Sequence, residues 1–255
     1  MTLGLPDAPT ERLAERLRHE DPDRFAMAML APSEARARLV TLYALNAELA
    51  RTALSARDPL IAEMRVQWWT DRLGALADAP PPPHELLSPL WSAWKGRGAD
   101  FTSLAEARRH DAAREPFPTI EAVVAYADAT GGALMTHAAR TLGAPDAPAL
   151  HAQGRGAALT AWLRAYPALQ ALSLGLSKAD PTQLAALAEI AMQAFHQAAA
   201  ARRTLPRIAA PALFAGPAPM RALRAVAARQ APVAPSDFSR RAALARLALT
   251  GRWWV

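Results

Sequence analysis

The sequence predicts an all-α protein, and three observations carry that prediction. Apolar residues recur three and four apart through most of the 255 residues, which is the period of a helix with one buried face. No stretch alternates β-branched or aromatic residues with polar ones, as a half-buried strand requires. Proline follows Asp or Ser at several expected helix starts, where its missing N–H costs nothing. The length suffices for one sizeable core, so we expect a single domain over residues 1–255.

The N-terminal part begins with a short helix over residues 10–19. We expect residues 1–20 to form an extension to the main body. Pro32 and Ser33 start the next helix, because proline is well tolerated in a first turn. Its expected buried face consists of Leu39, Leu42, Tyr43, Asn46, Leu49, Ala50 and Ala53.

A third helix starts at Asp58 and Pro59 by the same signal. Its expected buried face consists of Ile61, Met64, Trp68 and Trp69. The proline run at 80–83 breaks the chain into a loop. Short helices are expected over residues 84–95 and 100–110.

The C-terminal part is expected to contain longer helices. One runs from about 119 to 142 and ends at Gly143, and another covers 149–172, with Pro167 as a kink or an end. The alanine-rich segment 181–203 is strongly helical. A proline-rich loop follows, and the chain closes with helices over 219–230 and 236–250, of which the second belongs to a basic C-terminal segment, 236–255.

Positive charge is concentrated towards the C-terminus. Residues 1–146 contain 16 Lys or Arg and 20 Asp or Glu, whereas residues 147–255 contain 13 and 3. This excess predicts an anionic partner: a membrane surface, an acidic protein or nucleic acid. A compositional preference for arginine explains the same counts, since Lys95 and Lys178 are the only lysines. Nucleic acid is not expected, because helix-turn-helix spacing, an RNP motif and interleaved stacking aromatics are all missing.

The basic ending SRRAALARLALTGRWWV suits either an anionic membrane surface or a last helix docked on the protein body. Leu244, Leu247 and Ala248 form a stripe that favours docking. Every apolar stretch is shorter than the roughly 20 residues that span a bilayer. The first residues lack a basic and then apolar signal-peptide pattern. The chain has no cysteine, which fits a reducing compartment. We expect a cytoplasmic protein, peripheral on the inner membrane face.

Motifs for common catalytic and cofactor chemistry are missing. The sequence has no HExxH, no phosphate-binding glycine loop and no GxSxG elbow. Six histidines occur without helical pairing: His19, His84, His110, His137, His151 and His196. We therefore expect no metal site and no cofactor. Three acidic pairs lie four residues apart and are expected to be solvated: Asp7 with Glu11, Glu11 with Glu15, and Asp111 with Glu115.

Gly131 and Gly132 interrupt a helical pattern, where each glycine costs about 1 kcal/mol relative to alanine. Close packing of another helix explains them, and room for a ligand beside the backbone is the alternative. The candidate pocket residues are Tyr43, Asn46, Ala47, Trp68, Gly131, Gly132 and Arg164.

Four segments resemble the squalene/phytoene synthase family: DPDRFAMAMLAPSEARARLVTLYALNAELAR (21–51), DPLIAEMRVQWWTDRLGAL (58–76), FPTIEAVVAYADATGGALMTHAARTLG (117–143) and GRGAALTAWLRAYPAL (154–169). The resemblance implies an isoprenoid-synthase-like helical bundle around a central apolar cavity. It also implies a position in the branch that is similar to the mitochondrial assembly factor of respiratory complex I and its bacterial relatives.

Catalytic members of that family carry two aspartate motifs, which bind Mg²⁺ and the diphosphates of two isoprenoid substrates. The resemblance places the first motif on Ala50 and Leu54 and the second on Ala165 and Leu169, with Ala161 where catalytic members have Asn. Arg164 matches the family. No catalytic residue is therefore expected.

The expected function is that of a non-catalytic assembly or scaffold factor for a membrane protein complex. The resemblance implies a role like that in complex I assembly, with a lipid or isoprenoid chain such as a quinone tail as a ligand. The alternative is an active Mg²⁺-dependent prenyltransferase that uses the displaced acids Glu48, Glu63 and Asp71.

Overall fold

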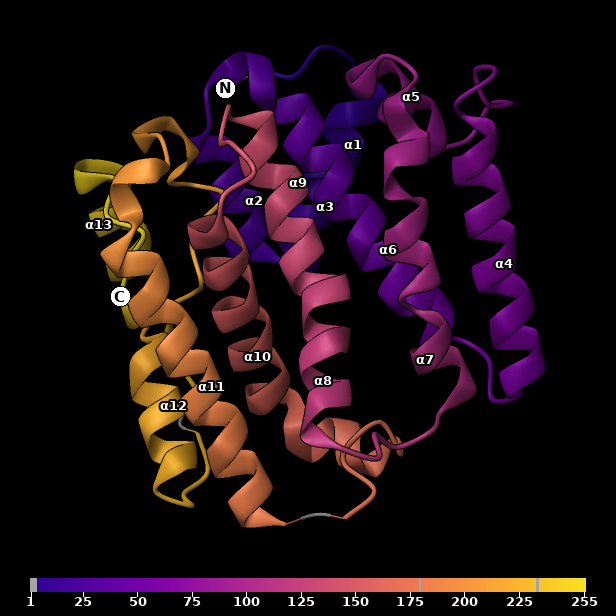
Figure 1. The fold of residues 1–255 in the computed structure, drawn as a ribbon. Coiled ribbons are helices and arrows are strands. Elements are labelled where there is room, and N and C mark those ends of the chain that lie inside the picture. The colour runs from indigo at the N-terminus through magenta and orange to yellow at the C-terminus, as the bar shows by residue number, and fades with distance from the viewer. Residues whose placement is uncertain (1–3, 179, 233) are drawn as a thin grey trace. The chain divides into compact units, whose positions relative to one another are not determined.

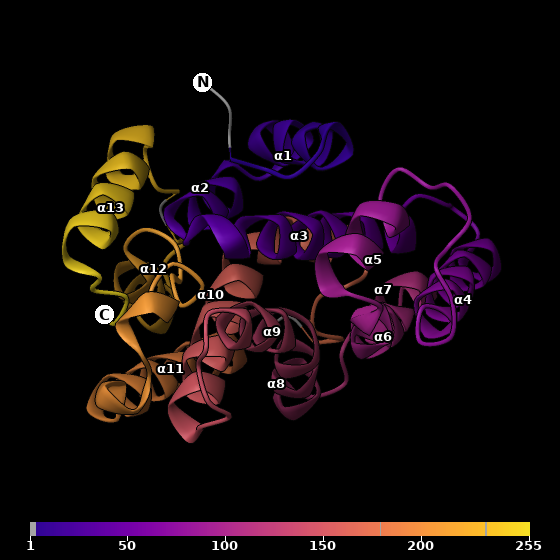
Figure 2. The same cartoon turned by 90° about the horizontal axis from the view of Figure 1, so that it is seen from above.

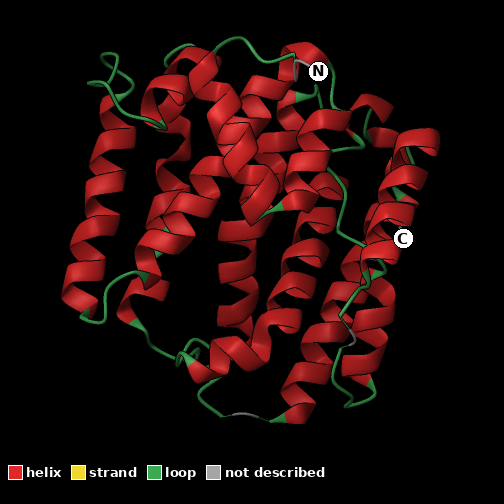
Figure 3. Cartoon of the chain, turned by 180° about the vertical axis from the view of Figure 1, so that it is seen from behind, coloured by secondary structure: helices red, strands yellow, loops and turns green. Residues whose placement is uncertain are grey.

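The computed structural model describes residues 4–178, 180–232 and 234–255, and the described part is all-α. Its regular elements are helices, as Figure 3 shows, apart from one isolated parallel bridge between Phe117 and Leu176. The predicted fold class is confirmed. Within the described ranges, none of the helices combines the length and hydropathy needed to cross a bilayer.

The chain forms two compact units, Met1–Arg114 and Glu115–Val255 (Figure 1). Unit 1 contains α1 (Ala8–Glu20), α2 (Pro22–Leu30), α3 (Ser33–Leu54), α4 (Pro59–Ala75), α5 (Leu87–Trp94), the 3₁₀ turn η1 (Arg97–Phe101), α6 (Thr102–Glu106) and α7 (Arg109–Ala113).

The predicted helix over 10–19 is α1, and α2 is a helix that the sequence reading missed. Both begin with a side-chain cap. The Asp7 carboxylate accepts from the backbone N–H of Thr10 at 2.8 Å, and Asp21 accepts from that of Arg24 at 3.0 Å. Each cap satisfies an N–H that a helix start leaves without a partner.

Helix α3 is the central element of unit 1, because α1, α2, α4, α5 and α7 all pack against it (Figure 2). Its predicted face is confirmed for six residues, which are buried: Leu39, Leu42, Tyr43, Asn46, Leu49 and Ala53. Ala50 is half-buried.

The predicted face of α4 is wrong for three of its four residues. Ile61, Met64 and Trp68 are 46%, 64% and 40% exposed, and only Trp69 is buried. The face that packs on α3, α6 and α7 instead contains Ala62, Val66, Trp69 and Leu73. Helix α4 carries apolar residues on two faces, so spacing alone selects neither one.

Unit 2 contains α8 (Ile120–Ala127), the π-helical turn η2 (Asp128–Gly132), α9 (Ala133–Thr141), α10 (Pro148–Ala171), α11 (Pro181–Ala200), the 3₁₀ turns η3 (Arg202–Thr204) and η4 (Arg207–Ala209), α12 (Pro219–Ala227) and α13 (Asp237–Thr250). Helices α10 and α11 lie side by side in Figures 1 and 2 and share the apolar core of this unit.

Pro167 does not end its helix, because α10 continues to Ala171. A proline removes one backbone N–H from the helical ladder. Here the missing N–H lies four residues before the last residue of the helix, so few hydrogen bonds beyond it depend on an unbroken ladder. Of the two expectations for Pro167, a kink or an end, the structure excludes the end, and the helix covers the predicted range almost completely.

The two glycines that interrupt the helical pattern lie in the π-helical turn, against α10. A Cβ on Gly131 would come within 2.8 Å of the Ala158 Cβ. A Cβ on Gly154 would come within 3.1 Å of the Gly132 Cα. Close packing of η2 on α10 accounts for all three glycines, since only a residue without Cβ allows such an approach.

The C-terminal helix α13 is attached through a narrow strip. Leu247 is buried and Leu244 is half-buried, but Ala248 is exposed, so the predicted stripe is wrong at that residue. The following Trp253 is only 3% exposed. The end of the chain is thus held by Leu247 and Trp253.

Candidate functional site

The resemblance places the family's first motif on the last two turns of α3, where Ala50 is half-buried and Leu54 is 36% exposed. One turn earlier, Asn46 is buried and accepts a hydrogen bond of 3.2 Å on Oδ1 from Nη2 of Arg108. The same guanidinium pairs with Asp111 at 3.0 Å, and both side chains of that pair are largely buried. The prediction that Asp111 is a solvated acid is therefore wrong.

A second guanidinium covers the end of α3. Arg114 donates through Nη2 to the backbone carbonyls of Ala56 at 2.5 Å and Leu54 at 3.3 Å. A cation is favourable there, because the last carbonyls of a helix carry partial negative charge.

Magnesium requires oxygen ligands, with carboxylates as its usual protein partners. Ala50 and Leu54 supply none, and the amide oxygen of Asn46 already accepts a hydrogen bond from Arg108. The residues at the first motif therefore do not fit the Mg²⁺ ion that catalytic members of the family hold.

The second motif falls on α10 in unit 2. Ala161 and Ala165 are exposed in the structure and Leu169 is half-buried. Arg164, which matches the family, donates through Nη2 to the carbonyl of Pro217 at 2.7 Å. Arg164 thus fastens the loop that leads into α12.

The three displaced acids of the enzymatic alternative have separate partners. Glu48 pairs with Arg51, Glu63 pairs with Arg109, and Asp71 accepts from Gln67 at 2.6 Å. In the part of the chain that the structure describes, no three His, Asp or Glu side chains are grouped as metal ligands.

A pocket of about 380 Å³ lies in unit 1, on the side of α3 that faces α4 and the loop before α5. It is lined by Glu48, Arg51, Thr52, Ser55, Arg65, Trp68, Trp69 and His84. Of the candidate pocket residues taken from the sequence, only Trp68 is among them. On α3, Arg51 and Thr52 follow Glu48 by three and four residues, so these side chains share a face, which differs from that of Ala50 and Leu54.

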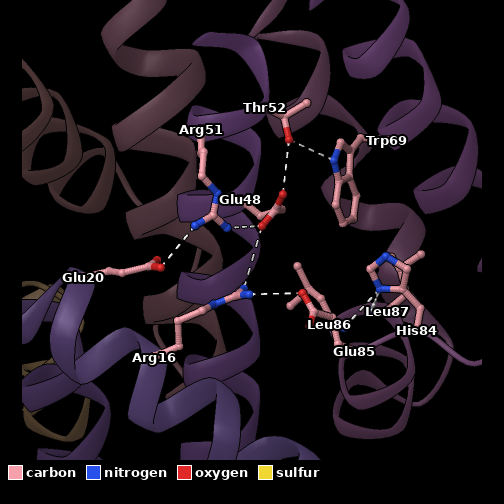
Figure 4. A network of polar contacts seen from close by, with 10 residues as sticks. All are labelled: Arg16, Glu20, Glu48, Arg51, Thr52, Trp69, His84, Glu85, Leu86 and Leu87. Carbon is pink, nitrogen blue, oxygen red and sulfur yellow. Dashed lines mark hydrogen bonds and ion pairs between the residues drawn. The ribbon is translucent and has the colours of Figure 1, made fainter. Parts of the chain in front are cut away.

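A polar network fixes the α3 side of this pocket (Figure 4). Glu48 is paired with Arg51 and lies 3.9 Å from Arg16. Arg51 also contacts Glu20 at 3.1 Å, and Arg16 contacts Glu85 at 3.2 Å. The hydrogen bond to the Glu48 carboxylate raises the pKa of Arg51. These alternating charges hold three segments of the unit together.

The aromatic side of the pocket is fixed to the same network. Trp69 donates through Nε1 to Oγ1 of Thr52 at 3.2 Å, and Thr52 in turn donates to Glu48 at 3.4 Å (Figure 4). His84 accepts on Nδ1 from the backbone N–H groups of Leu86 and Leu87, at 3.1 and 3.2 Å. A ring nitrogen that accepts carries no proton, so Nε2 bears the N–H.

Tyr43, another candidate pocket residue, is buried in unit 1. Its hydroxyl has no hydrogen-bond partner among the described residues. Burial raises the pKa of the Tyr43 phenol well above its ordinary value, because the phenolate would lose its hydration. Arg24 lies over the ring, 5.9 Å from its centroid.

The all-α helical frame defines a member of the isoprenoid-synthase class of folds. The chain belongs to the squalene/phytoene synthase family, whose model matches residues 17–173. The chain is similar to the Bos taurus protein named NADH dehydrogenase (ubiquinone) complex I, assembly factor 6. The two are 27% identical over 171 residues, and the match covers 64% of this chain and 51% of that protein.

The Homo sapiens protein of the same name is 27% identical over 159 residues, with 60% of this chain and 48% of that protein covered. The chain thus spans about half the length of the curated relatives it matches. A solved dehydrosqualene synthase in complex with a ligand has a TM-score of 0.71 at 12% identity, over 94% of this chain and 95% of that one. That likeness confirms the isoprenoid-synthase fold.

Proposed function

We propose that this protein is a non-catalytic member of the family that serves as an assembly or scaffold factor for a membrane protein complex. The observation that carries the proposal is the chemistry at the motif positions. Ala50, Leu54, Ala165 and Leu169 stand where catalysis requires carboxylates. Beside the first of these sites, Arg108 occupies the oxygen of Asn46 and pairs with the carboxylate of Asp111. A fold kept without its metal ligands still supplies surfaces for binding.

The relatives support respiratory complex I as the complex in question, since the bovine and human proteins are named as its assembly factors. The test is crosslinking followed by affinity purification of the tagged protein from its native host. We expect subunits of respiratory complex I to be enriched over an unrelated tagged protein. Their reproducible absence would contradict the proposal.

The enzymatic alternative has its own assay. Purified protein is incubated with Mg²⁺ and farnesyl or geranylgeranyl diphosphate, and we expect no condensed product. Product that disappears in Glu48→Ala or Asp71→Ala would establish a prenyltransferase that uses displaced acids.

We also propose that the family's apolar cavity is kept for a lipid or isoprenoid chain. The support is the retained helical frame, with small or apolar residues in place of the motif carboxylates. Organic extraction of the purified protein and mass spectrometry should recover a prenyl lipid in stoichiometric amount. Recovery of only trace lipid would contradict the proposal that the cavity holds such a chain.

The outer face of α13 supports attachment to an anionic membrane, on the inner side of the cytoplasmic membrane. Phe238 and Leu249 are each 82% exposed. With Ala242 and Ala245, also exposed, they are spaced by four, three and four residues, and therefore share the face opposite Leu247. Arg241 and Arg246 flank this stripe, and such an arrangement suits a helix that lies in the interface of an anionic bilayer.

Vesicle co-sedimentation tests this attachment. We expect binding to vesicles with phosphatidylglycerol, little binding to phosphatidylcholine alone, and loss of binding at high salt. The double variant Phe238→Ala/Leu249→Ala should lose binding, as should Arg241→Gln/Arg246→Gln. The control Arg57→Gln/Arg97→Gln removes the same charge elsewhere and should bind as the wild type. Equal loss in the control would mean that net charge, rather than α13, is responsible.

A further inference from the structure

The pocket in unit 1 brings together groups that recognise an anion and groups that recognise a flat ring. The guanidiniums come from Arg51 on α3 and Arg65 on α4. The rings are the indoles of Trp68 and Trp69, also on α4, and the imidazole of His84. Neither the family's motifs nor the proposed assembly role accounts for this combination.

The two arginines differ in their charge partners. Arg51 contacts two carboxylates, those of Glu20 and Glu48. Arg65 donates to a neutral group, the Ser55 hydroxyl, at 2.6 Å, and no carboxylate lies within ion-pair distance of it among the described residues. A guanidinium has five N–H donors in a planar fork, so Arg65 retains capacity for an anion.

The aromatic wall is partly covered and partly open. Trp69 is buried, and its indole meets that of Trp68 edge to face, with the ring centroids 5.1 Å apart. Trp68 is 40% exposed. His84 lies 5.9 Å from Trp68 at a moderate tilt of 36° between the rings. The guanidinium of Arg72 lies over the Trp68 ring, 5.5 Å from its centroid, and the exposed part of this indole offers a stacking surface for another ring.

The pocket is also rigid on several sides. Trp69 is tied to Thr52 and Thr52 to Glu48, whose carboxylate is paired with Arg51. His84 is held by two backbone N–H groups, which leaves its Nε2–H as a further donor. Groups fixed before binding lose little conformational entropy when a ligand arrives.

We propose that this pocket binds a flat aromatic ring that carries a phosphate or carboxylate group. Arg65 binds the anionic group, and Trp68 stacks on the ring. The volume of about 380 Å³ falls in the ordinary range for small-molecule sites. The site lies on a different face of α3 from Ala50 and Leu54, so it is separate from the family's diphosphate positions.

Phenyl phosphate is the probe, because it combines both features, and fluorescence of the pocket tryptophans gives the signal. We expect saturable binding to the purified full chain. Benzoate tests the carboxylate form, while inorganic phosphate and benzyl alcohol supply the anion and the ring alone. Both of these should bind at least tenfold more weakly than phenyl phosphate or benzoate.

Matched variants assign the binding to its residues. Arg65→Gln should weaken phenyl phosphate at least tenfold, and Arg65→Lys should recover part of the loss, since it restores the charge without the fork. The control is Arg57→Gln, which removes one charge from an exposed residue that does not line the pocket. It should change the affinity less than twofold. Trp68→Leu should weaken phenyl phosphate but leave inorganic phosphate unchanged, measured by calorimetry because the fluorophore is lost.

Three results would overturn the assignment: no saturation by phenyl phosphate or benzoate up to 10 mM or so, no advantage over inorganic phosphate, or equal losses in Arg65→Gln and Arg57→Gln. Circular dichroism and the thermal midpoint show that each variant is folded. Because purified protein and small probes suffice, a negative result would leave the assembly role untouched, and a failed crosslinking experiment would leave this site untouched.

Discussion

Arg108 and Asn46 are joined by a hydrogen bond of 3.2 Å, one helical turn before Ala50, the first altered motif position. The same guanidinium forms a buried ion pair with Asp111. The Asn46 amide oxygen and the Asp111 carboxylate are therefore both engaged by one guanidinium, next to the position where the family resemblance places the first motif.

The buried ion pair between Arg108 and Asp111 should contribute strongly to stability. Arg108→Ala should lower the free energy of unfolding by about 3–5 kcal/mol, because it leaves Asp111 buried without its charge partner. Urea denaturation followed by circular dichroism measures the change. The control is Arg97→Ala, which breaks the exposed pair with Asp100 and should cost at most about 1 kcal/mol. Similar losses in both variants would mean that the buried pair has no special role.

Tyr43→Phe should raise the free energy of unfolding by about 1 kcal/mol or more. The Tyr43 hydroxyl is buried without a hydrogen-bond partner among the described residues, and an unsatisfied buried group of this kind is costly. The substitution removes the hydroxyl and keeps the ring. A loss of stability in Tyr43→Phe would show that the hydroxyl has a partner in solution, such as a bound ligand.

The same residue should make the protein sensitive to alkaline pH. Burial raises the pKa of Tyr43 in the folded state above its ordinary value of 10.0, so above pH 10 the unfolded chain loses the proton first. The unfolded state then binds fewer protons, and stability falls as pH rises, by at most about 1.4 kcal/mol per pH unit for one group. Urea midpoints between pH 9 and 11 should decline less in Tyr43→Phe than in the wild type.

Two glycines in helices should respond to alanine in opposite directions. Gly154→Ala should destabilise the protein by about 1–3 kcal/mol, because the new Cβ would lie 3.1 Å from the Gly132 Cα and carbonyl oxygen. Gly74→Ala should stabilise it by up to about 1 kcal/mol, since its Cβ meets no described atom within 4 Å and alanine favours the helix. Thermal midpoints of the two variants provide the comparison.

Substitutions of a buried and an exposed aromatic residue near the C-terminus should have different effects on the free energy of unfolding. Trp253→Ala should cost about 3–5 kcal/mol, because its side chain is almost completely buried. Phe238→Ala should leave the free energy of unfolding within about 0.5 kcal/mol, since Phe238 is 82% exposed. A large loss in Phe238→Ala would show that the outer face of α13 is covered by protein, and would argue against the membrane proposal.

Local sequence signals were sufficient for most of the helices. The starts of α3 and α4 agree with the signals at Pro32–Ser33 and Pro59, because first-turn proline acts within a few residues. The buried face of α3 was also predictable, since it is apolar over five turns. Helix α2 was missed because nine residues between two caps give too short a periodic pattern.

Contacts between residues far apart in the sequence determine which side chains line the pocket. Glu48, Arg65 and His84 come from three segments that have no common sequence pattern. His84 in particular gave no signal, since its role as a cap for Leu86 and Leu87 depends on the turn it adopts. Trp68 was expected both in the buried face of α4 and among the pocket residues, and it lies at the pocket. It is not buried because α4 has two apolar faces, and the partners α6 and α7 cover the other one.

The sequence by itself determined the all-α class, the family and the absence of carboxylates at Ala50, Leu54, Ala165 and Leu169, because these are properties of residue identity and local spacing. Only the tertiary structure decided that Arg108 reaches Asn46, that Asp111 is buried, and that Arg65 and Trp68 share a pocket. Each of those facts depends on which surfaces of distant helices meet, and packing free energy rather than local preference makes that choice.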